Sequence, residues 1–362
     1  MTNKKKEVSP LVLYILPAVV AFLTSFMVGR LLCTQKLAAY FIDNIGGKKL
    51  HQKAVPASGG IALVLGVMIP VLIFDRELIY GSYFYFLLGA IGLFLLGLID
   101  DLKPLGWLLK LVLQIVIITA VVVLGDLRLE SVLLEHSFIR LPYALSVLIS
   151  VVLITFLTNA FNFIDGVDGL ATAVALVFIL GLLYFQTPFS GVFLMCMAAA
   201  LFGFRQLNRE PAALFMGDSG SLFIGFSCAC LAIFFLEADL SINNAQLDSF
   251  QQRLPILFAL FWFPIADTIR VLLLRLSRKQ ALFKRDKLHS YSSLIRLGYG
   301  HSRIVTIVVV LTLLNVFVAW YLEPLLGVSL FLVVQVALSV ALHFYFNSLI
   351  KKFTNQKESN NG

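Results

Sequence analysis

The segment LLKLVLQIVIITAVVVLG, residues 108–125, decides the class of fold. It is apolar except for Lys110 and Gln114, and it approaches the length of about 20 residues that a helix needs to cross a bilayer. Ten further segments of the chain have the same character. Of all 362 residues, 60% are hydrophobic and only 13% are charged, which is about half the charged fraction of a soluble domain. The sequence therefore predicts a polytopic membrane protein.

Only helices suit these eleven segments, because none of them alternates apolar and polar residues as the strands of a membrane barrel do. We expect an all-α, integral membrane helix bundle that forms one transmembrane domain over residues 1–350. Residues 351–362 are polar, and we expect a disordered cytoplasmic tail there. The predicted spans are approximately 10–32, 58–75, 82–99, 108–125, 143–160, 169–187, 191–205, 219–237, 253–276, 303–322 and 328–349.

The positive charges predict how the chain lies in the membrane. With eleven spans, 21 of the 28 Lys and Arg residues fall on one side, although Lys4–Lys6 fall on the other. Cytoplasmic loops of membrane proteins carry such an excess, so this side is predicted to be cytoplasmic. The net charge of +8 comes from residues that flank the spans. We therefore expect no nucleic acid as a partner. The four cysteines have no metal-ligand spacing and are expected to be small core residues.

Five short polar patches interrupt the apolar sequence, and all of them fall at the predicted cytoplasmic ends of spans. Placing a charged group in a bilayer costs about 2.5–3.5 kcal/mol even on the gentler insertion scales. A chain that does so repeatedly on one side is predicted to use these groups together, as an active site. The patches are Lys48–His51, Asp100–Asp101, Asn159–Asp168, Gly217–Ser221 and Arg285–His289.

Two carboxylates, Asp100 and Asp101, end the third span. Neighbouring residues of a helix point in directions about 100° apart, so we expect the two to have different partners. One could contact a metal or a phosphate, and the other could orient a lysine. Lys110 and Gln114 lie one turn apart on a single face of the fourth span. The alternative is a solvated helix boundary, which Lys103 beside them would fit.

The densest patch is NAFNFIDGVDG, residues 159–169. A spacing of three places Asn159 and Asn162 on one stripe of a helix end, and two glycines then allow a tight turn. Oxygen-bearing side chains such as those of Asp165 and Asp168 suit a hard cation, for which Mg²⁺ is the candidate. The alternative is that these residues only cap helices.

Residues Gly217–Ser221 open the eighth span. The N–H groups at a helix N-terminus favour an anion, but Asp218 would repel it unless a cation lay between them. This patch therefore predicts a metal–phosphate pair. The basic loop 277–303 could contribute to the site, but its composition fits a solvated cytoplasmic connection equally well. Asp267 is predicted to lie within the membrane, where Arg270 is a candidate partner.

In order and spacing, these motifs make the chain resemble the polyprenyl-phosphate N-acetylhexosamine-1-phosphate transferases of glycosyltransferase family 4. The resemblance covers residues 40–305. It implies that the protein transfers a sugar 1-phosphate from a UDP-sugar to undecaprenyl phosphate and releases UMP, at the cytoplasmic face of a bacterial inner membrane. The chain departs from the family at His289-Ser-Tyr291-Ser292, where relatives have a histidine cluster. This argues against the phospho-N-acetylmuramoyl-pentapeptide transferase branch and leaves the sugar and the pathway open.

The resemblance and the chemistry of the residues together give the predicted site. Asp100 or Asp101 could steer the lipid phosphate, with a role as base left open, and Asp218 with Asn162 would hold Mg²⁺, for which Mn²⁺ is an alternative. A homodimer is one option for the assembly, and membrane lipid is an expected partner. The predicted catalytic residues are Asp100, Asp101 and Asp218, the metal ligands are Asn162 and Asp218, and the substrate-binding residues are Lys49, His51, Lys110, Asn159, Asp165, Asp168, Arg285 and His289.

A transporter or flippase is the competing hypothesis. Its acidic residues would form an ion path and would be spread through the middle of the bilayer. In this sequence the acidic residues gather at the cytoplasmic ends of the predicted spans, and Asp267 is the main exception.

Overall fold

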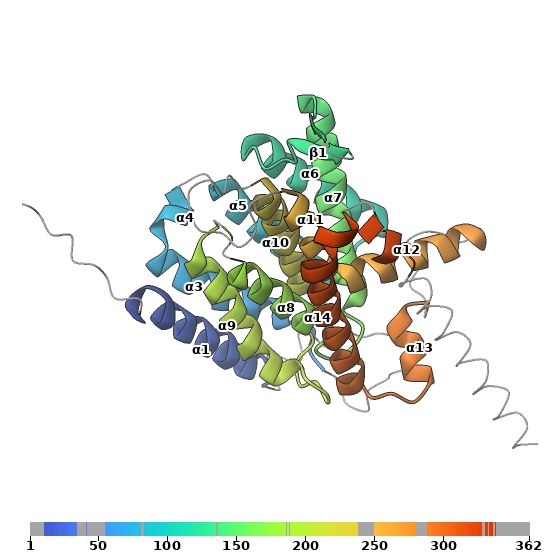
Figure 1. Cartoon of the computed structure of the whole chain (residues 1–362). Coiled ribbons are helices and arrows are strands. Elements are labelled where there is room, and N and C mark those ends of the chain that lie inside the picture. Colours follow the sequence, from blue (N-terminus) through green and yellow to red (C-terminus); the bar gives the residue numbers. More distant parts are fainter. Residues whose placement is uncertain are drawn as a thin grey trace, which may run out of the picture.

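A computed structural model describes residues 11–34, 41, 55–80, 83–134, 137–185, 187, 189–237, 250–279 and 288–327, with scattered residues between 330 and 337. These residues form a helix bundle with one short β-hairpin (Figure 1). The elements are η1 (Leu11–Ile15), α1 (Leu16–Leu32), α3 (Gly59–Phe74), α4 (Arg76–Tyr80), α5 (Phe84–Leu102), α6 (Trp107–Leu124), β1 (Ser131–Leu134), β2 (Ser137–Arg140), α7 (Tyr143–Ile164), α8 (Leu170–Tyr184), α9 (Gly191–Asn208), α10 (Gly217–Glu237), α11 (Phe250–Leu260), α12 (Trp262–Ser277), α13 (Ser290–Arg296) and α14 (His301–Leu326).

The prediction of a polytopic helical membrane protein is confirmed. Within the described residues, seven helices are long and apolar enough to cross a membrane, or eight if α11 and α12 form one span. These two helices meet at an angle of 69°, where the sequence had predicted a single span over 253–276. Helices α3 and α8 are apolar but shorter. The count of eleven is not confirmed, because segment 328–349 lies almost wholly outside the described residues. The predicted tail 351–362 lies outside them as well.

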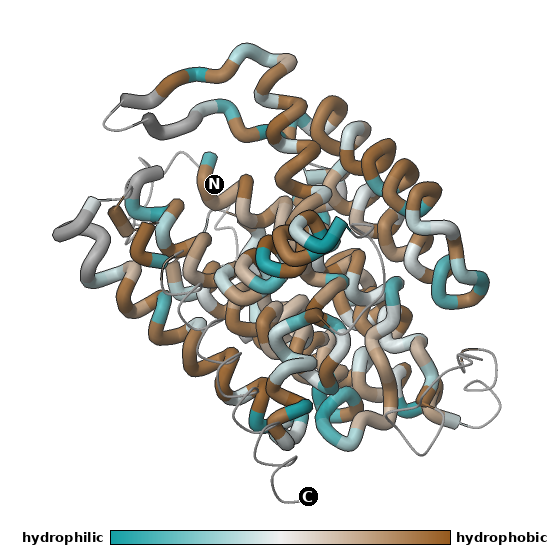
Figure 2. Tube along the Cα trace, turned by 90° about the vertical axis from the view of Figure 1, so that its right-hand side faces the viewer, coloured by the Kyte–Doolittle hydropathy of each residue, from teal (hydrophilic) through white to brown (hydrophobic). Residues whose placement is uncertain are grey.

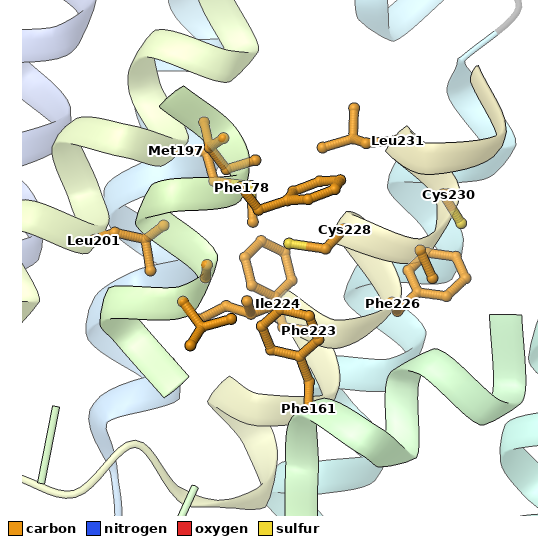
Figure 3. Packing of buried hydrophobic residues seen from close by; sticks show 14 of the residues in the cluster. Phe161, Phe178, Met197, Leu201, Phe223, Ile224, Phe226, Cys228, Cys230 and Leu231 are labelled. Carbon is orange, nitrogen blue, oxygen red and sulfur yellow. The ribbon is translucent and has the colours of Figure 1, made fainter. Parts of the chain in front are cut away.

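Helix α10 runs through the centre of the bundle and is almost completely buried. It packs against α5, α7, α3, α8 and α11. Figure 3 shows Phe223, Ile224 and Cys228 of this helix among the side chains of Phe161 and Phe178. Because lipid tails are as apolar as the side chains, close packing stabilises such helix pairs more than the hydrophobic effect does. The four cysteines are free thiols, three of them buried, as expected for core residues.

Glycines allow two helices to approach the start of α10 closely. A Cβ atom on Gly97 of α5 would lie 2.4 Å from the backbone oxygen of Asp218. One on Gly60 of α3 would lie 2.3 Å from the backbone nitrogen of Gly220. Small residues at such contacts let helix backbones touch. The result is that α3 and the C-terminal end of α5 are pressed against the polar end of α10.

The outer faces of the bundle suit a lipid environment. Most of the large apolar side chains along α1 and α6 are exposed, and hydrophilic residues lie mainly near helix ends and connections (Figure 2). Helix α6 nevertheless turns Lys110 and Gln114 inward, and Gln114 is fully buried. Helix α6 therefore faces lipid on one side and the site on the other.

A β-hairpin covers the end of the bundle opposite to the polar patches. Strands β1 and β2 pair antiparallel, with Ser131 opposite Arg140. The backbone N–H of Glu130 donates a hydrogen bond to Glu237, at the end of α10, over 3.0 Å. The all-helical prediction missed this hairpin. Its strands are only four residues long. An alternation of apolar and polar residues over so short a segment is hard to recognise between two spans.

Candidate active site

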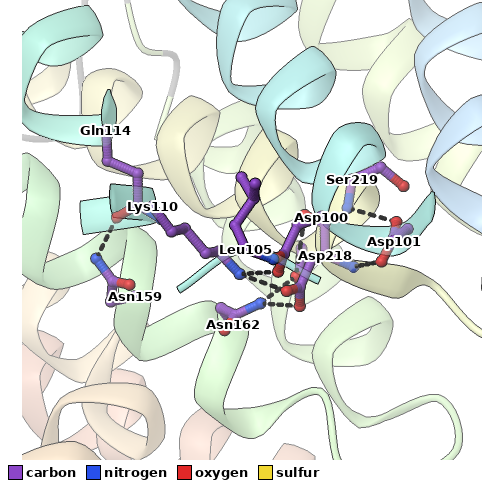
Figure 4. Close-up of polar contacts among 10 residues, drawn as sticks. Asp100, Asp101, Leu105, Lys110, Gln114, Asn159, Asn162, Asp218 and Ser219 are labelled. Carbon is purple, nitrogen blue, oxygen red and sulfur yellow. Dashed lines mark hydrogen bonds and ion pairs between the residues drawn. The ribbon is translucent and has the colours of Figure 1, made fainter. Parts of the chain in front are cut away.

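Lys110 lies at the centre of the polar end and binds carboxylates from two other helices (Figure 4). Its Nζ is 3.0 Å from Oδ2 of Asp100 and also donates to Oδ2 of Asp218. Asp100 is fixed further by the backbone N–H of Leu105, 2.5 Å from its Oδ1. The three charged side chains are only 12–19% exposed, so their attraction is screened less than at an open surface. The prediction that one of the two neighbouring aspartates orients a lysine is confirmed.

Asp101 has a different role, as expected from its direction on the helix. Its carboxylate accepts the backbone N–H groups of Asp218, at 2.7 Å, and Ser219, at 2.9 Å. It thus caps α10 from a neighbouring helix and satisfies two donors that a helix start leaves open. Gly217 is required beside it, since its φ is +73° and a Cβ would lie 2.6 Å from Oδ2 of Asp101. These two N–H groups bind Asp101, which corrects the expectation that they bind a phosphate.

The last turn of α7 connects the site to α6 and α10. Asn162 donates its Nδ2 to Oδ1 of Asp218, at 2.7 Å, and to Oγ of Ser221, at 2.8 Å. Asn159 donates to Oε1 of Gln114, at 2.8 Å. The predicted stripe of two asparagines and the shared face of Lys110 and Gln114 are therefore both present. Four helices meet here: α5, α6, α7 and α10.

Asp165 follows α7 directly and differs from the other site carboxylates. It is half-buried, and its carboxylate makes no hydrogen bond or ion pair with the part of the chain that the structure describes, although its backbone N–H donates to the backbone oxygen of Asn162 at 3.4 Å. Burial, and then the charges of Asp218, Asp101 and Asp168, raise the pKa of this carboxyl well above its usual range. A carboxylate in such surroundings favours a proton or a bound cation. In the same described residues, no three His, Cys, Asp or Glu side chains are grouped closely enough to form a metal centre by themselves.

Asp168 holds the turn that carries Asp165. It is buried, and its Oδ2 accepts the backbone N–H of Ala212 at 3.2 Å. The same oxygen lies 3.3 Å from Nδ1 of His301, at the start of α14. Arg205 of α9 donates to the backbone oxygen of Gly169 at 3.0 Å. Sequence reasoning assigned Asp168 to substrate binding and did not detect this structural network.

His289 is held by Asp267, which lies inside the membrane segment α12. Its Nδ1 is 2.7 Å from Oδ2 of Asp267. The other oxygen of Asp267 binds Arg270, at 3.1 Å, and the backbone N–H of Ser290, at 2.7 Å. The predicted pair of Asp267 and Arg270 is confirmed, while the contact with His289 was missed. The ring of His289 lies 6.0 Å from that of Phe163 of α7, so this cluster adjoins the turn after α7.

Three predicted site residues, Lys49, His51 and Arg285, lie outside the described residues, and their roles stay predictions. Among the functional contacts that were missed, only Asp267 carried a signal in the sequence. A carboxylate inside a span is costly and calls for partners, but the sequence does not say that one of them is His289.

Comparison with known proteins shows the family of this chain. The family model of glycosyl transferase family 4 matches residues 83–236, which include Asp100, Lys110, Asn162 and Asp218. A decaprenyl-phosphate N-acetylglucosaminephosphotransferase of Mycolicibacterium smegmatis is 31% identical over 290 residues, which are 72% of this chain and 70% of the relative. The chain belongs to glycosyl transferase family 4.

Two further relatives mark the range within this family. A probable undecaprenyl-phosphate N-acetylglucosaminyl 1-phosphate transferase of Bacillus subtilis is 27% identical over 74% of this chain and 73% of its own length. A phospho-N-acetylmuramoyl-pentapeptide-transferase of Caldicellulosiruptor bescii is also 27% identical, over 84% of this chain and 91% of its own length.

Proposed function

We propose that this protein transfers an N-acetylhexosamine 1-phosphate from a UDP-sugar to a polyprenyl phosphate, with undecaprenyl phosphate as the expected acceptor. The observation that carries the proposal is the meeting of Asp100, Lys110, Asn162 and Asp218 at one end of a membrane bundle. Several relatives are named as polyprenyl-phosphate N-acetylglucosamine phosphotransferases. The excess of Lys and Arg on the side of the site supports a cytoplasmic active site in a bacterial inner membrane.

The reaction exchanges one phosphoanhydride bond for another. An oxygen of the lipid phosphate attacks the phosphorus next to the sugar, the bond from that phosphorus to UMP breaks, and UMP leaves with the electron pair. Catalysis of such transfers is mostly positioning and neutralisation of charge. A phosphate monoester has its second pKa near 6, so at neutral pH the acceptor needs no base. Asp100 therefore serves to hold Lys110.

Lys110 is suited to bind a phosphate. An ammonium group has three N–H donors, and two of them point to Asp100 and Asp218. The third has no acceptor among the described residues, and we assign it to an oxygen of the lipid phosphate. Because the two carboxylates fix the ammonium before the substrate binds, the lysine side chain loses little conformational entropy on binding.

The site also has a donor set that fits Mg²⁺, with Mn²⁺ as the alternative. Carboxylate and amide oxygens are the ligands of hard cations. The carboxylate of Asp165 has no hydrogen-bond partner among the described residues, and no hydrogen bond within them reaches Oδ1 of Asn162. Asp218 and Asn162 would hold the ion, with Asp165 beside them. When bound, the ion would neutralise the diphosphate and stabilise the leaving UMP.

The nucleotide sugar is assigned to the remaining part of the site. The turn from Asp165 to Gly169 is fixed by Asp168, and His289 is fixed by Asp267. Both lie beside Asn162 and the end of α7. No observation in the described part of the chain favours the transporter hypothesis.

Asp218→Ala tests this proposal. The purified full-length protein would be given UDP-N-acetylglucosamine, undecaprenyl phosphate and Mg²⁺, and UMP release would be measured. We expect at least ~100-fold slower release, because the proposed ion would lose a ligand and the developing charge on the leaving UMP would lose its stabilisation, which has effects of this size. Glu77→Ala, an exposed carboxylate on α4, is the matched control and should keep the wild-type rate. An unchanged rate in Asp218→Ala would refute the role of Asp218. If the wild type releases no UMP from any UDP-N-acetyl sugar in a panel, the proposed function is wrong.

A further inference from the structure

One aromatic side chain of the short helix α13, Tyr291, contacts the end of α7. Its ring is stacked on that of His289, with centroids 5.2 Å apart and planes only 7° from parallel. Its hydroxyl donates to the backbone oxygen of Phe163, at 3.4 Å. Tyr291 therefore contacts both His289 and the last turn of α7.

The ring also lies directly against Gly166. A Cβ atom added to Gly166 would lie 2.3 Å from the hydroxyl oxygen of Tyr291, 2.6 Å from Cζ and 2.9 Å from Cε2. Atoms do not approach this closely, so the space beside Gly166 is filled by the tyrosine. Gly166 does not have the positive φ that favours glycine. Its lack of a side chain is therefore explained by Tyr291.

This contact concerns the residue next to Gly166 in the chain. Asp165 makes no hydrogen bond with the described residues that would fix its carboxylate. Asp168 anchors the turn on one side, through Ala212. On the other side the turn meets Tyr291, while His289 is held from α12 by Asp267. Tyr291 is thus the side chain that touches both the Asp165 turn and the anchored histidine.

We propose that Tyr291 is a positioning residue that docks α13 on the Asp165–Gly166 turn, so that His289 and Asp165 face the same nucleotide sugar. The inference rests on the proposed function and names the element that sets the donor site. A displacement of about 1 Å in such a site can cost on the order of 100-fold in rate. Loss of the contact between Tyr291 and Gly166 is therefore expected to lower the reaction rate.

A double-mutant cycle tests the proposal. The full-length protein would be prepared as wild type, Gly166→Ala, Tyr291→Ala and the double variant. UMP release would be followed with UDP-N-acetylglucosamine and undecaprenyl phosphate varied in turn. Each single variant should raise KM for the UDP-sugar by ~10-fold or more, while KM for the lipid phosphate stays within about 2-fold. In the Tyr291→Ala background, Gly166→Ala should add almost nothing, because the side chain it collides with is gone.

Two controls separate docking from general damage. Tyr291→Phe keeps the ring that stacks on His289 and fills the space beside Gly166, and it removes the hydroxyl that bonds Phe163, so KM for the UDP-sugar should change by less than about 3-fold. Gly106→Ala adds a Cβ where nothing lies within 4 Å, and its kinetics should match the wild type.

Several outcomes would overturn the proposal. They are independent penalties for Gly166→Ala and Tyr291→Ala, a harmless Gly166→Ala, or variants that lose stability without a selective rise in KM for the UDP-sugar. Thermal unfolding of the same four proteins distinguishes this failure from that of the proposed function. If the wild type releases no UMP, the function and the placement of substrate both fail. The docking contact is then decided by whether the two substitutions are coupled in stability.

Discussion

Two charged clusters of the site are built differently. The Lys110 cluster (Lys110, Asp100, Asp218) draws its members from α6, α5 and α10, and each side chain keeps 12–19% of its surface exposed. The Asp267 cluster (Asp267, Arg270, His289) is drawn from α12 and the residue before α13. The Asp267 side chain is only 1% exposed, while those of Arg270 and His289 keep 13% and 9%. In the first cluster one cation joins two carboxylates; in the second, one carboxylate joins two basic groups.

This difference indicates that the Lys110 cluster takes part in the reaction, whereas Asp267 stabilises the fold. A partly exposed cluster can exchange a partner for a substrate phosphate or a cation at modest desolvation cost. The Asp267 carboxylate cannot, because removing one of its partners leaves an uncompensated buried charge. Asp267 binds both His289 and the N–H of Ser290 and so holds the segment that carries His289. We therefore expect substitutions in the Lys110 cluster to affect rate, and substitutions of Asp267 to affect stability first.

Lys110→Met should have the largest effect on activity. It removes the cation that would meet the lipid phosphate and leaves Asp100 and Asp218 to repel that phosphate. We expect UMP release to fall by ~1,000-fold, with a thermal midpoint close to that of the wild type. Lys110→Arg is the matched variant, since it keeps the charge but not the compact geometry of the ammonium, and it should be intermediate. A variant that unfolds, or one that keeps the wild-type rate, would remove the distinction between the clusters.

Asp267→Asn should have the largest effect on stability. Breaking a buried ion pair on one side costs about 3–5 kcal/mol in soluble proteins, and here Arg270 and His289 lose their common partner. Thermal unfolding in detergent should show a clearly lower midpoint. The double variant Asp267→Asn with Arg270→Gln should recover part of the loss, because the uncompensated charge is gone. No recovery, or a midpoint as high as that of Lys110→Met, would contradict the assignment of Asp267 to support.

Most of the fold could be predicted from the sequence because each membrane helix is one continuous apolar segment, which can be recognised without knowing its partners. Ten of the predicted segments lie on helices of the structure. The bend between α11 and α12 was not predicted, although Pro264 lies near the start of α12, because a proline is compatible with a helix start as well as with a kink. The hairpin of β1 and β2 was missed because two strands of four residues give too little periodicity to detect.

For the site, the sequence predicted what local geometry fixes. Lys110 and Gln114 had to share a face, and Asp100 and Asp101 had to diverge. The choice of partners depends on residues far apart in the chain. Asp101 caps a helix 117 residues later, which only the close approach of Gly97 to α10 makes possible.

Glu210→Gln should have the smallest effect, at a position that belongs to neither cluster. Oε2 of Glu210 accepts the backbone N–H of Ser302, at 2.7 Å, and so caps α14 next to His301. This N–H is the main cause that lowers the pKa of Glu210 below its usual range. A carboxylate with a lowered pKa stabilises the fold fully above its unfolded pKa, near 4.3, and loses that contribution as the pH falls through the folded pKa. Because the group is exposed, the contribution should be below about 1 kcal/mol. Thermal midpoints of Glu210→Gln and wild type should therefore differ slightly at about pH 7 and converge towards about pH 3. A difference that is independent of pH would mean that the charge of Glu210 does not stabilise this cap.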